Sequence, residues 1–251
     1  MALLDVTFTP ADFQTLHARD LSATTCVVFD VLRATSTLIA ALANGAAGVV
    51  PAASIGEALQ LRAHHPGALL GGEREGLRIT AAQSGGLEFD LGNSPREYTP
   101  SAVQGRMIIS TTTNGTRALR ACAGAARVLA ASFANLRATA DTLAANPPES
   151  LILVCGGTFE EAAYEDALCA GAMADLLWCR YAGAHVTDSA QIARLTWRAA
   201  SGDLMGAMQA ARNGRRLLAL PQFRDDVEFC LRRDTSGIVA QLGADGVVRR
   251  A

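Results

Sequence analysis

The chain has 251 residues, of which 50% are hydrophobic and 18% are charged, so it must bury a substantial core. This composition excludes a disordered chain, and a formal net charge of -2 offers no basic excess for a nucleic-acid partner. All 22 basic residues are arginines, which are suited to pairing with phosphate or carboxylate groups.

Neither export nor membrane insertion is expected from the sequence. The N-terminus, MALLDVTF, lacks the basic stretch and long apolar run of a signal peptide. No segment reaches the roughly 18 to 20 uncharged apolar residues that a membrane span requires. The cysteines show no CxxC spacing, which favours buried, reduced thiols in a cytoplasmic protein. They are Cys26, Cys122, Cys155, Cys169, Cys179 and Cys230.

Short β-branched runs alternate with alanine-rich runs over most of the chain, which indicates βα units around a largely parallel sheet. A capping box formed by Ser54 and Glu57 is expected to open one of the helices. The predicted strands cover residues 25–30, 48–52, 68–72, 106–110, 127–132 and 150–157. The predicted helices run from Ala34 to Asn44, from Ser54 to about His64, from near Asn114, from Asn135, and from Glu160 to Tyr181.

The last third of the chain has a different pattern. Residues 188–233 are predicted to be helical, with breaks around Gly202 and Gly214 and at Pro221. GIVAQLGADGVVRR, residues 237–250, is typical of a hairpin because its ADG turn separates two β-rich runs. No composition shift marks a domain boundary. The sequence therefore predicts a single domain over residues 1–251, or two lobes with a variable helical third at about 185–251.

FDVLRATST, residues 29–37, places Asp30 at the end of a buried strand and Arg33 at the start of a helix. A carboxylate in this position can hold a hard cation, while the arginine and the helix N-terminus favour a phosphate or carboxylate group. The alternative is a purely structural Asp30–Arg33 ion pair with the neighbouring hydroxyls as caps.

STTTNGT, residues 110–116, also follows a predicted strand and opens a helix. Its run of hydroxyl residues, its amide and its glycine can bind an oxyanion through hydroxyl and backbone N–H donors. A helix cap alone needs one hydroxyl rather than four. The motif lacks the lysine and spacing of a Walker P-loop, so nucleoside triphosphate binding is not indicated.

Two further loops carry candidate residues. GGEREG, residues 71–76, holds Glu73 between glycines that allow the backbone to turn a carboxylate into a cleft. GNSPREY, residues 92–98, is predicted to start a helix with Ser94 as N-cap, Pro95 at the first helical position and Glu97 as capping-box partner. Asn93 beside this helix start is expected to face a ligand.

YEDALCAG, residues 164–171, carries Glu165 and Asp166 in an otherwise apolar helix. Adjacent buried acids are costly unless one of them meets water or a cation, so one is expected to bind metal and the other to bind an arginine. A solvated helix face is the alternative. No HxxxH spacing and no GxSxG elbow occur, so acids, hydroxyls and amides remain, which suits Mg²⁺ better than zinc.

Taken in order, these motifs resemble the motif series of the 2-phosphosulfolactate phosphatase family. The motifs are FDVLRATST, GGEREG, LGNSPREY, STTTNGTRAL, ASFANLRA and CGGTFEEAAYEDALCAG. The resemblance covers residues 24–172 and is specific, because both order and spacing agree. It implies an α/β fold in three α/β/α layers with a mixed, largely parallel sheet. It also implies Mg²⁺-dependent removal of phosphate from 2-phospho-3-sulfolactate, a step toward coenzyme M.

The resemblance also implies roles for residues at the matching positions. Asp30, Glu73 and Asp166 become candidate Mg²⁺ ligands, and the candidate catalytic residues are Asp30, Arg33, Glu165 and Asp166. The candidate substrate contacts are Arg33, Asn93, Ser94, Thr111, Thr112, Thr113 and Asn114.

Phosphate-monoester hydrolysis needs acceleration of up to about 10²¹-fold, so the negative charge of the phosphoryl group must be strongly stabilised. This favours a metal ion, Arg33 and the 111–114 segment as the groups that surround the phosphoryl oxygens. The nucleophile is metal-activated water, a carboxylate or a hydroxyl. Two other functions fit the same residues: a non-catalytic protein that binds a small anion, and a phosphotransferase on a related phosphorylated acid. A homodimer is expected for so apolar a chain.

Overall fold

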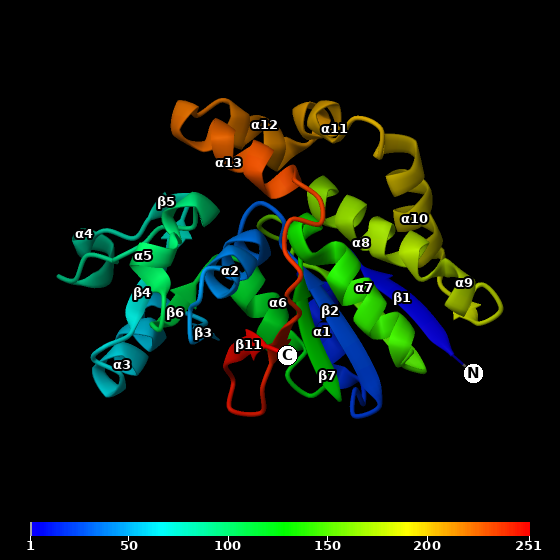
Figure 1. Ribbon diagram of the computed structural model, residues 1–251, viewed down its shortest axis with the longest axis horizontal. Coiled ribbons are helices and arrows are strands. Elements are labelled where there is room, and N and C mark those ends of the chain that lie inside the picture. Colours follow the sequence, from blue (N-terminus) through cyan, green and yellow to red (C-terminus); the bar gives the residue numbers. More distant parts are fainter. Residues whose placement is uncertain (1) are drawn as a thin grey trace.

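The computed structural model describes residues 2–251 and contains one sheet of 11 strands with helices on both faces (Figure 1). The strand order across the sheet is β5-β4-β6-β3-β11-β10-β7-β2-β8-β1-β9. The strands are β1 Leu3–Thr7, β2 Thr24–Phe29, β3 Gly48–Pro51, β4 Leu69–Arg74, β5 Leu77–Arg78, β6 Met107–Thr111, β7 Arg127–Ala131, β8 Ser150–Cys155, β9 His185–Val186, β10 Ala240–Leu242 and β11 Val248–Arg250.

Helices connect most of the strands, and several more follow β9. They are α1 Asp12–Ala18, α2 Ala34–Ala43, α3 Ile55–His64, α4 Ala81–Ser84, α5 Pro100–Val103, α6 Gly115–Ala121, α7 Leu136–Ala145, α8 Tyr164–Leu176, α9 Trp178–Tyr181, α10 Asp188–Ala200, α11 Leu204–Ala210, α12 Arg212–Leu218 and α13 Pro221–Leu231. Two short 3₁₀ turns are η1 Pro95–Glu97 and η2 Phe133–Asn135.

The sheet consists of two parallel sets of strands joined by the C-terminal hairpin. β7, β2, β8, β1 and β9 pair in parallel, and so do β3, β6 and β4. The hairpin β10–β11 pairs antiparallel with β7 on one side and with β3 on the other, and the edge strand β5 pairs antiparallel with β4. The predicted α/β fold with a mixed, largely parallel sheet is therefore confirmed, as is the hairpin. Its place in the middle of the sheet was not predicted.

The alternation of side chains along β2 explains the layers. Cys26 and Val28 pack with α1, α2 and α6 on one face, whereas Val27 and Phe29 pack with α7, α8 and α10 on the other. Every residue of β2 is buried. A strand covered on both faces buries side chains at every position, which explains the continuous hydrophobic run at residues 26–29. The buried Thr24 hydroxyl at its start donates to Ser150 Oγ at 3.1 Å.

The helices differ from the prediction in three places. The helix expected to start at Glu160 begins at Tyr164, because Gly157 and Phe159 adopt positive φ angles of 70° and 57° in a turn. It ends at Leu176, and α9 is a separate helix. Gly214 does not break a helix but lies inside α12, where its missing Cβ permits close contact with the carbonyl oxygen of Met208.

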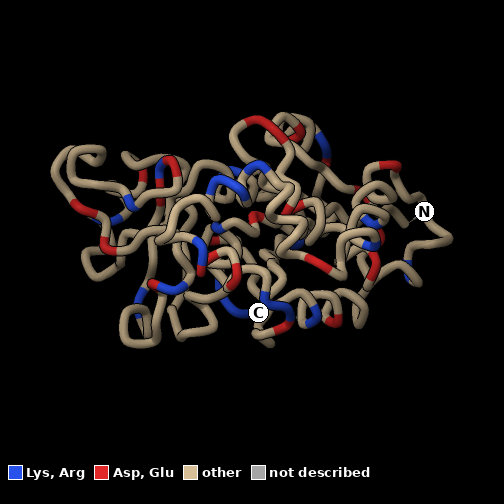
Figure 2. Tube along the Cα trace, turned by 90° about the horizontal axis from the view of Figure 1, so that it is seen from above, with Lys and Arg blue, Asp and Glu red and all other residues tan. Residues whose placement is uncertain are grey.

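The thiols and charges of residues 2–251 agree with a well-packed, near-neutral protein. The six cysteines are free, and all are buried except Cys179. Acidic and basic residues are intermingled along the trace in Figure 2. Among the helices of the described chain, none has the length and apolar character that crossing a membrane requires.

Candidate active site

A pocket lies where loops from both parallel sets of strands meet α12. The predicted residues that line it are Asp30, Arg33, Glu73, Asn93, Thr112, Thr113 and Asn114, and the residues not predicted include Glu75, Gly157, Thr158, Phe159, Asn213, Arg216 and Leu217. Most of these residues follow the carboxyl ends of strands, where ligands bind in α/β sheets. Motifs far apart in the chain therefore form one site.

Asp30 follows β2 and lies at the base of the pocket. Its Oδ1 accepts a hydrogen bond of 3.0 Å from the backbone N–H of Ala34. Glycines make room for its other oxygen, because a Cβ at Gly115 would lie 2.8 Å from Oδ2 and one at Gly156 would lie 3.2 Å away. Burial raises the pKa of Asp30 to about 7, and the charges of Glu73 and Glu165 add to the effect. A nearby cation would favour its ionised form.

Glu73 joins two of the loops that form the pocket. Its Oε2 accepts the backbone N–H of Gly76 at 2.7 Å. Its Oε1 accepts both the backbone N–H and the hydroxyl of Thr113, each at 2.9 Å. These bonds hold the loop after β4 against the loop after β6.

The hydroxyls of the 111–113 run bind protein groups. Thr111 Oγ1 accepts from Arg74 at 3.1 Å, and Thr112 Oγ1 accepts the N–H of Thr116 at 3.2 Å. The Asn114 amide donates to the carbonyl of Phe159 at 2.9 Å and also to that of Gly156. Its Oδ1 is buried and has no hydrogen-bond partner among residues 2–251. The Asn114 Oδ1 therefore has no protein donor in the described chain and is available to a ligand.

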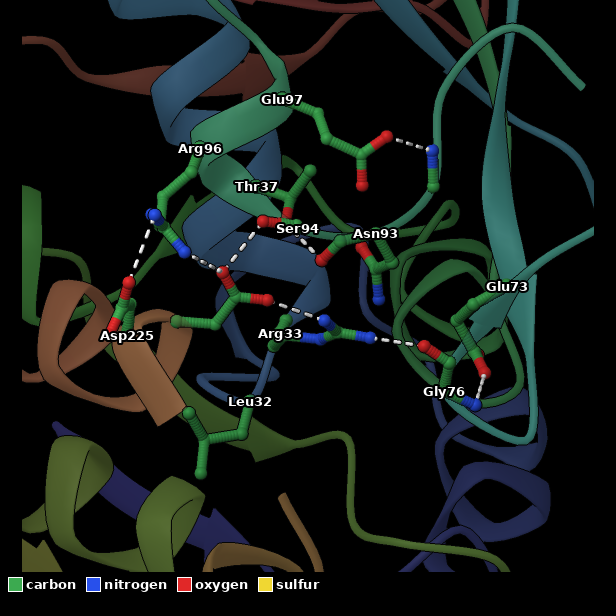
Figure 3. A network of polar contacts seen from close by, with 12 residues as sticks. Leu32, Arg33, Thr37, Glu73, Gly76, Asn93, Ser94, Arg96, Glu97 and Asp225 are labelled. Carbon is green, nitrogen blue, oxygen red and sulfur yellow. Dashed lines mark hydrogen bonds and ion pairs between the residues drawn. The ribbon is translucent and has the colours of Figure 1, made fainter. Parts of the chain in front are cut away.

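Arg33 forms an ion pair with a residue from the C-terminal third and not with Asp30. Its Nη1 lies 2.6 Å from Asp226 Oδ2, and its Nη2 donates to the carbonyl of Gly76 at 2.5 Å (Figure 3). The guanidinium also lies over the ring of Phe223, at 4.2 Å from the ring centroid. The structure therefore contradicts the alternative of an Asp30–Arg33 ion pair. Arg33 is fixed in place by α13.

Ser94 and Asn93 have different surroundings. Ser94 Oγ donates to Asp226 Oδ1 at 2.6 Å. It therefore helps to hold the ion-pair partner of Arg33 and does not line the pocket. The side chain of Asn93 lines the pocket, while its carbonyl accepts the Thr37 hydroxyl at 2.9 Å. The predicted capping box at η1 is wrong, because Ser94 makes no cap bond and Glu97 instead accepts the N–H of Gly92.

Glu165 and Asp166, in the first turn of α8, lie behind the pocket and are 1% exposed. A solvated helix face is thereby ruled out. Asp166 accepts the backbone N–H groups of Val31 at 2.7 Å and Gly157 at 3.0 Å, which joins the loops after β2 and β8. Glu165 Oε1 accepts the Asn213 amide at 2.8 Å. Burial raises the pKa of both carboxyls, and for Asp166 the charge of Asp30 adds to this.

The oxygen donors of the pocket suit a hard cation, although the described residues do not form a complete set of metal ligands. Among residues 2–251, no group of three or more His, Cys, Asp or Glu side chains is arranged to hold a metal. Mg²⁺ needs only one or two carboxylates, since waters and phosphate oxygens complete its shell. The pocket offers Asp30, Glu73 and the unpartnered Oδ1 of Asn114, all oxygen donors. Asp166 does not line the pocket.

Sequence reasoning missed Asp226, Asn213 and Arg216. For Asp226 a signal existed: it lies three residues after Phe223 and four before Cys230, both of which are buried, so it falls on the apolar face of α13. An acid on such a face needs a buried partner. Nothing comparable distinguishes Asn213 or Arg216 from the other polar residues of α12.

An α/β sheet with acids, an amide oxygen and arginines facing one pocket at its strand ends is typical of enzymes that act on small anionic substrates. The comparison with known families is more specific. A profile of the 2-phosphosulpholactate phosphatase family matches residues 10–244. The chain belongs to this family, which confirms the resemblance seen in the motifs.

Three relatives show the extent of the similarity, and each is named a probable 2-phosphosulfolactate phosphatase. The protein of Symbiobacterium thermophilum is 39% identical over 224 residues, which are 88% of this chain and 92% of its own. That of Caldicellulosiruptor saccharolyticus is 38% identical over 213 residues, covering 83% and 84%. That of Pseudothermotoga lettingae is 36% identical over 249 residues, covering 99% and 100%.

Proposed function

We propose that this chain hydrolyses 2-phospho-3-sulfolactate, or a closely related phosphorylated acid, to the hydroxy acid and phosphate with the help of Mg²⁺. The observation that carries the proposal is a single pocket that combines the acids Asp30 and Glu73 with the cations Arg33 and Arg216. Membership of the phosphatase family over residues 10–244 supports the reaction type. A role of the product in coenzyme M synthesis stays a prediction.

In this proposal, Asp30, Glu73 and the Asn114 Oδ1 hold the cation. When bound, Mg²⁺ neutralises phosphoryl oxygens and lowers the pKa of bound water. Arg33 adds a donor to the pocket, and its fixed position avoids the cost of ordering a long side chain around the substrate. The raised pKa of Asp30 suits it to take up or release a proton near neutral pH when no cation is bound.

Asp166 and Glu165 have a different part in this scheme. Asp166 uses both oxygens to accept backbone N–H groups, so we assign it the positioning of the loops that carry Asp30 and Gly157. Glu165 positions α12 through Asn213. Its Oε2 is buried and has no hydrogen-bond partner among residues 2–251.

Phosphate release is the direct test. Purified protein is assayed on phosphosulfolactate, phospholactate and p-nitrophenyl phosphate, with excess Mg²⁺ or with EDTA. We expect metal-dependent release, and Asp30→Asn is expected to remove most of it while leaving the fold intact. Asp141→Asn, on the exposed side of α7, is the matched control. Binding without turnover, or transfer of phosphate to an acceptor, would refute the hydrolase.

The proposal also covers the cellular compartment and the binding partners of the protein. Free cysteines, most of them buried, are typical of a reducing compartment, which supports the cytoplasm. The small phosphate ester is the proposed partner, and the homodimer expected from the sequence stays a prediction.

A further inference from the structure

Arg216 differs from the other pocket arginine in having no counter-ion. It projects from α12 into the pocket, and its Nη2 lies 3.1 Å from the position that a Cβ on Gly76 would occupy. Within residues 2–251 its guanidinium has no ion pair and no hydrogen bond. It lies over the ring of Phe159, at 5.9 Å from the ring centroid. It therefore retains its full charge and donors for a ligand.

Arg33 is not equivalent, although its Nη2 lies near the same glycine, 3.9 Å from that Cβ position. Its charge is offset by Asp226, and its two terminal nitrogens already donate to Asp226 and to Gly76. On α12 itself, Arg212 pairs with Glu161 and also donates to the Thr158 carbonyl. Of Arg33, Arg212 and Arg216, it is therefore Arg216 that is free to form a new bidentate contact with a ligand.

The acids of the pocket suggest which part of the substrate Arg216 meets. Asp30, Glu73 and Asn114 lie among the strand-end loops, where the phosphoryl group would meet the cation. Arg216 comes from α12 and approaches these residues beside the loop around Gly76, whose backbone N–H donates to Glu73. A planar guanidinium binds carboxylates and other oxyanions through paired hydrogen bonds. With the phosphoryl group at the cation and Arg33, the unpaired Arg216 guanidinium would be left for a second acid group of the substrate.

We infer that Arg216 binds the acid group of the substrate that is not transferred, a carboxylate or a sulfonate, and so selects phosphorylated acids over simple phosphate esters. This inference rests on the proposed function, and it gives the helical C-terminal third a role in substrate choice. Gly76 is required at its position because any side chain there would enter the space between the two guanidiniums.

The test compares substrates rather than activity alone. In Arg216→Met, the kcat/KM ratio of phosphosulfolactate to p-nitrophenyl phosphate is expected to fall about 10- to 100-fold, the effect of losing a charge-assisted contact. A fall in the phosphosulfolactate-to-phospholactate ratio would identify the sulfonate as the bound group. A fall in the phospholactate-to-p-nitrophenyl ratio would identify the carboxylate.

Arg215→Met is the matched control, because Arg215 is the neighbouring exposed arginine of α12 and donates to the Ala210 carbonyl. It should leave both ratios unchanged. Unchanged ratios in Arg216→Met, or ratios equally altered in the control, would overturn the inference.

A binding measurement separates this inference from the proposed function. Calorimetry with sulfolactate in the presence of Mg²⁺ needs no turnover, so it remains informative if wild-type protein releases no phosphate. Weaker binding in Arg216→Met supports the inference even then. Equal binding by the two proteins, or none by either, contradicts it.

Discussion

Removing Asp226 should destabilise the protein more than removing any exposed acid. In Asp226→Ala, the Arg33 guanidinium, whose side chain is 2% exposed, keeps its charge but loses its counter-ion, and the Ser94 hydroxyl loses its acceptor. Breaking a buried ion pair from one side costs about 3 to 5 kcal/mol. At roughly 2 to 4 °C per kcal/mol for a chain of this size, Tm should fall by about 6 to 20 °C.

Asp225→Ala is the matched control, because the adjacent Asp225 side chain is 63% exposed and pairs with Arg96 at 3.0 Å. Exposed pairs contribute about 0 to 1 kcal/mol, so its Tm should change little. The double variant Arg33→Met/Asp226→Ala should recover part of the loss, since no unpaired charge remains buried. Thermal and urea unfolding measure all three variants. Equal Tm values for Asp226→Ala and Asp225→Ala would refute the reasoning.

Three further predictions concern the base of the pocket. Gly115→Ala should cost about 1 to 3 kcal/mol and reduce turnover, because its Cβ would lie 2.8 Å from Asp30 Oδ2; Gly124→Ala, with open space around it, should do neither. Asp166→Asn should lower Tm by calorimetry, since an amide oxygen cannot replace both carboxylate acceptors; an unchanged Tm would contradict this. The folded-state pKa of Asp30 is raised to about 7, whereas its unfolded value is near 3.9. The contribution of Asp30 to the free energy of unfolding is therefore fully present below that unfolded value and is lost as the pH rises through about 7. Metal-free protein should therefore be less stable at about pH 8 than at about pH 5, and Mg²⁺ should raise Tm more at the higher pH; an equal rise at both would count against a cation beside Asp30.

Local patterns predicted most elements of the fold, because each depends on neighbours in the chain. The apolar run ending at Asp30 is β2, and the ADG turn forms the β10–β11 hairpin. The position of that hairpin between β3 and β7 was not predictable in the same way. Its pairing depends on backbone hydrogen bonds with strands more than a hundred residues away in sequence, and no local residue pattern encodes that partnership.

The site was predictable in part for a related reason. Polar residues directly after strands were identified, since a sheet brings the ends of parallel strands together. What each side chain does there was harder to predict, because it depends on which donor or acceptor lies opposite. Thr113 was expected to bind an anion, yet its hydroxyl donates to Glu73. An ion pair with Asp30 was the structural alternative for Arg33, but a helix nearly two hundred residues further along the chain provides its partner.

The residues at the strand ends and the residues on α12 and α13 are held in place by different interactions. Asp30 and Glu73 are held by the ladders of β2 and β4 and by backbone donors, so their positions depend on the sheet. Arg216 and Asp226 are held by apolar packing, because Leu217 and Phe223 belong to the core on that face. Figure 1 shows α12 and α13 near the top of the picture, above α2. Small shifts of packed helices against one another are a common form of structural change in proteins. Substitutions in the α12–α13 core should therefore alter substrate preference before they abolish phosphate release.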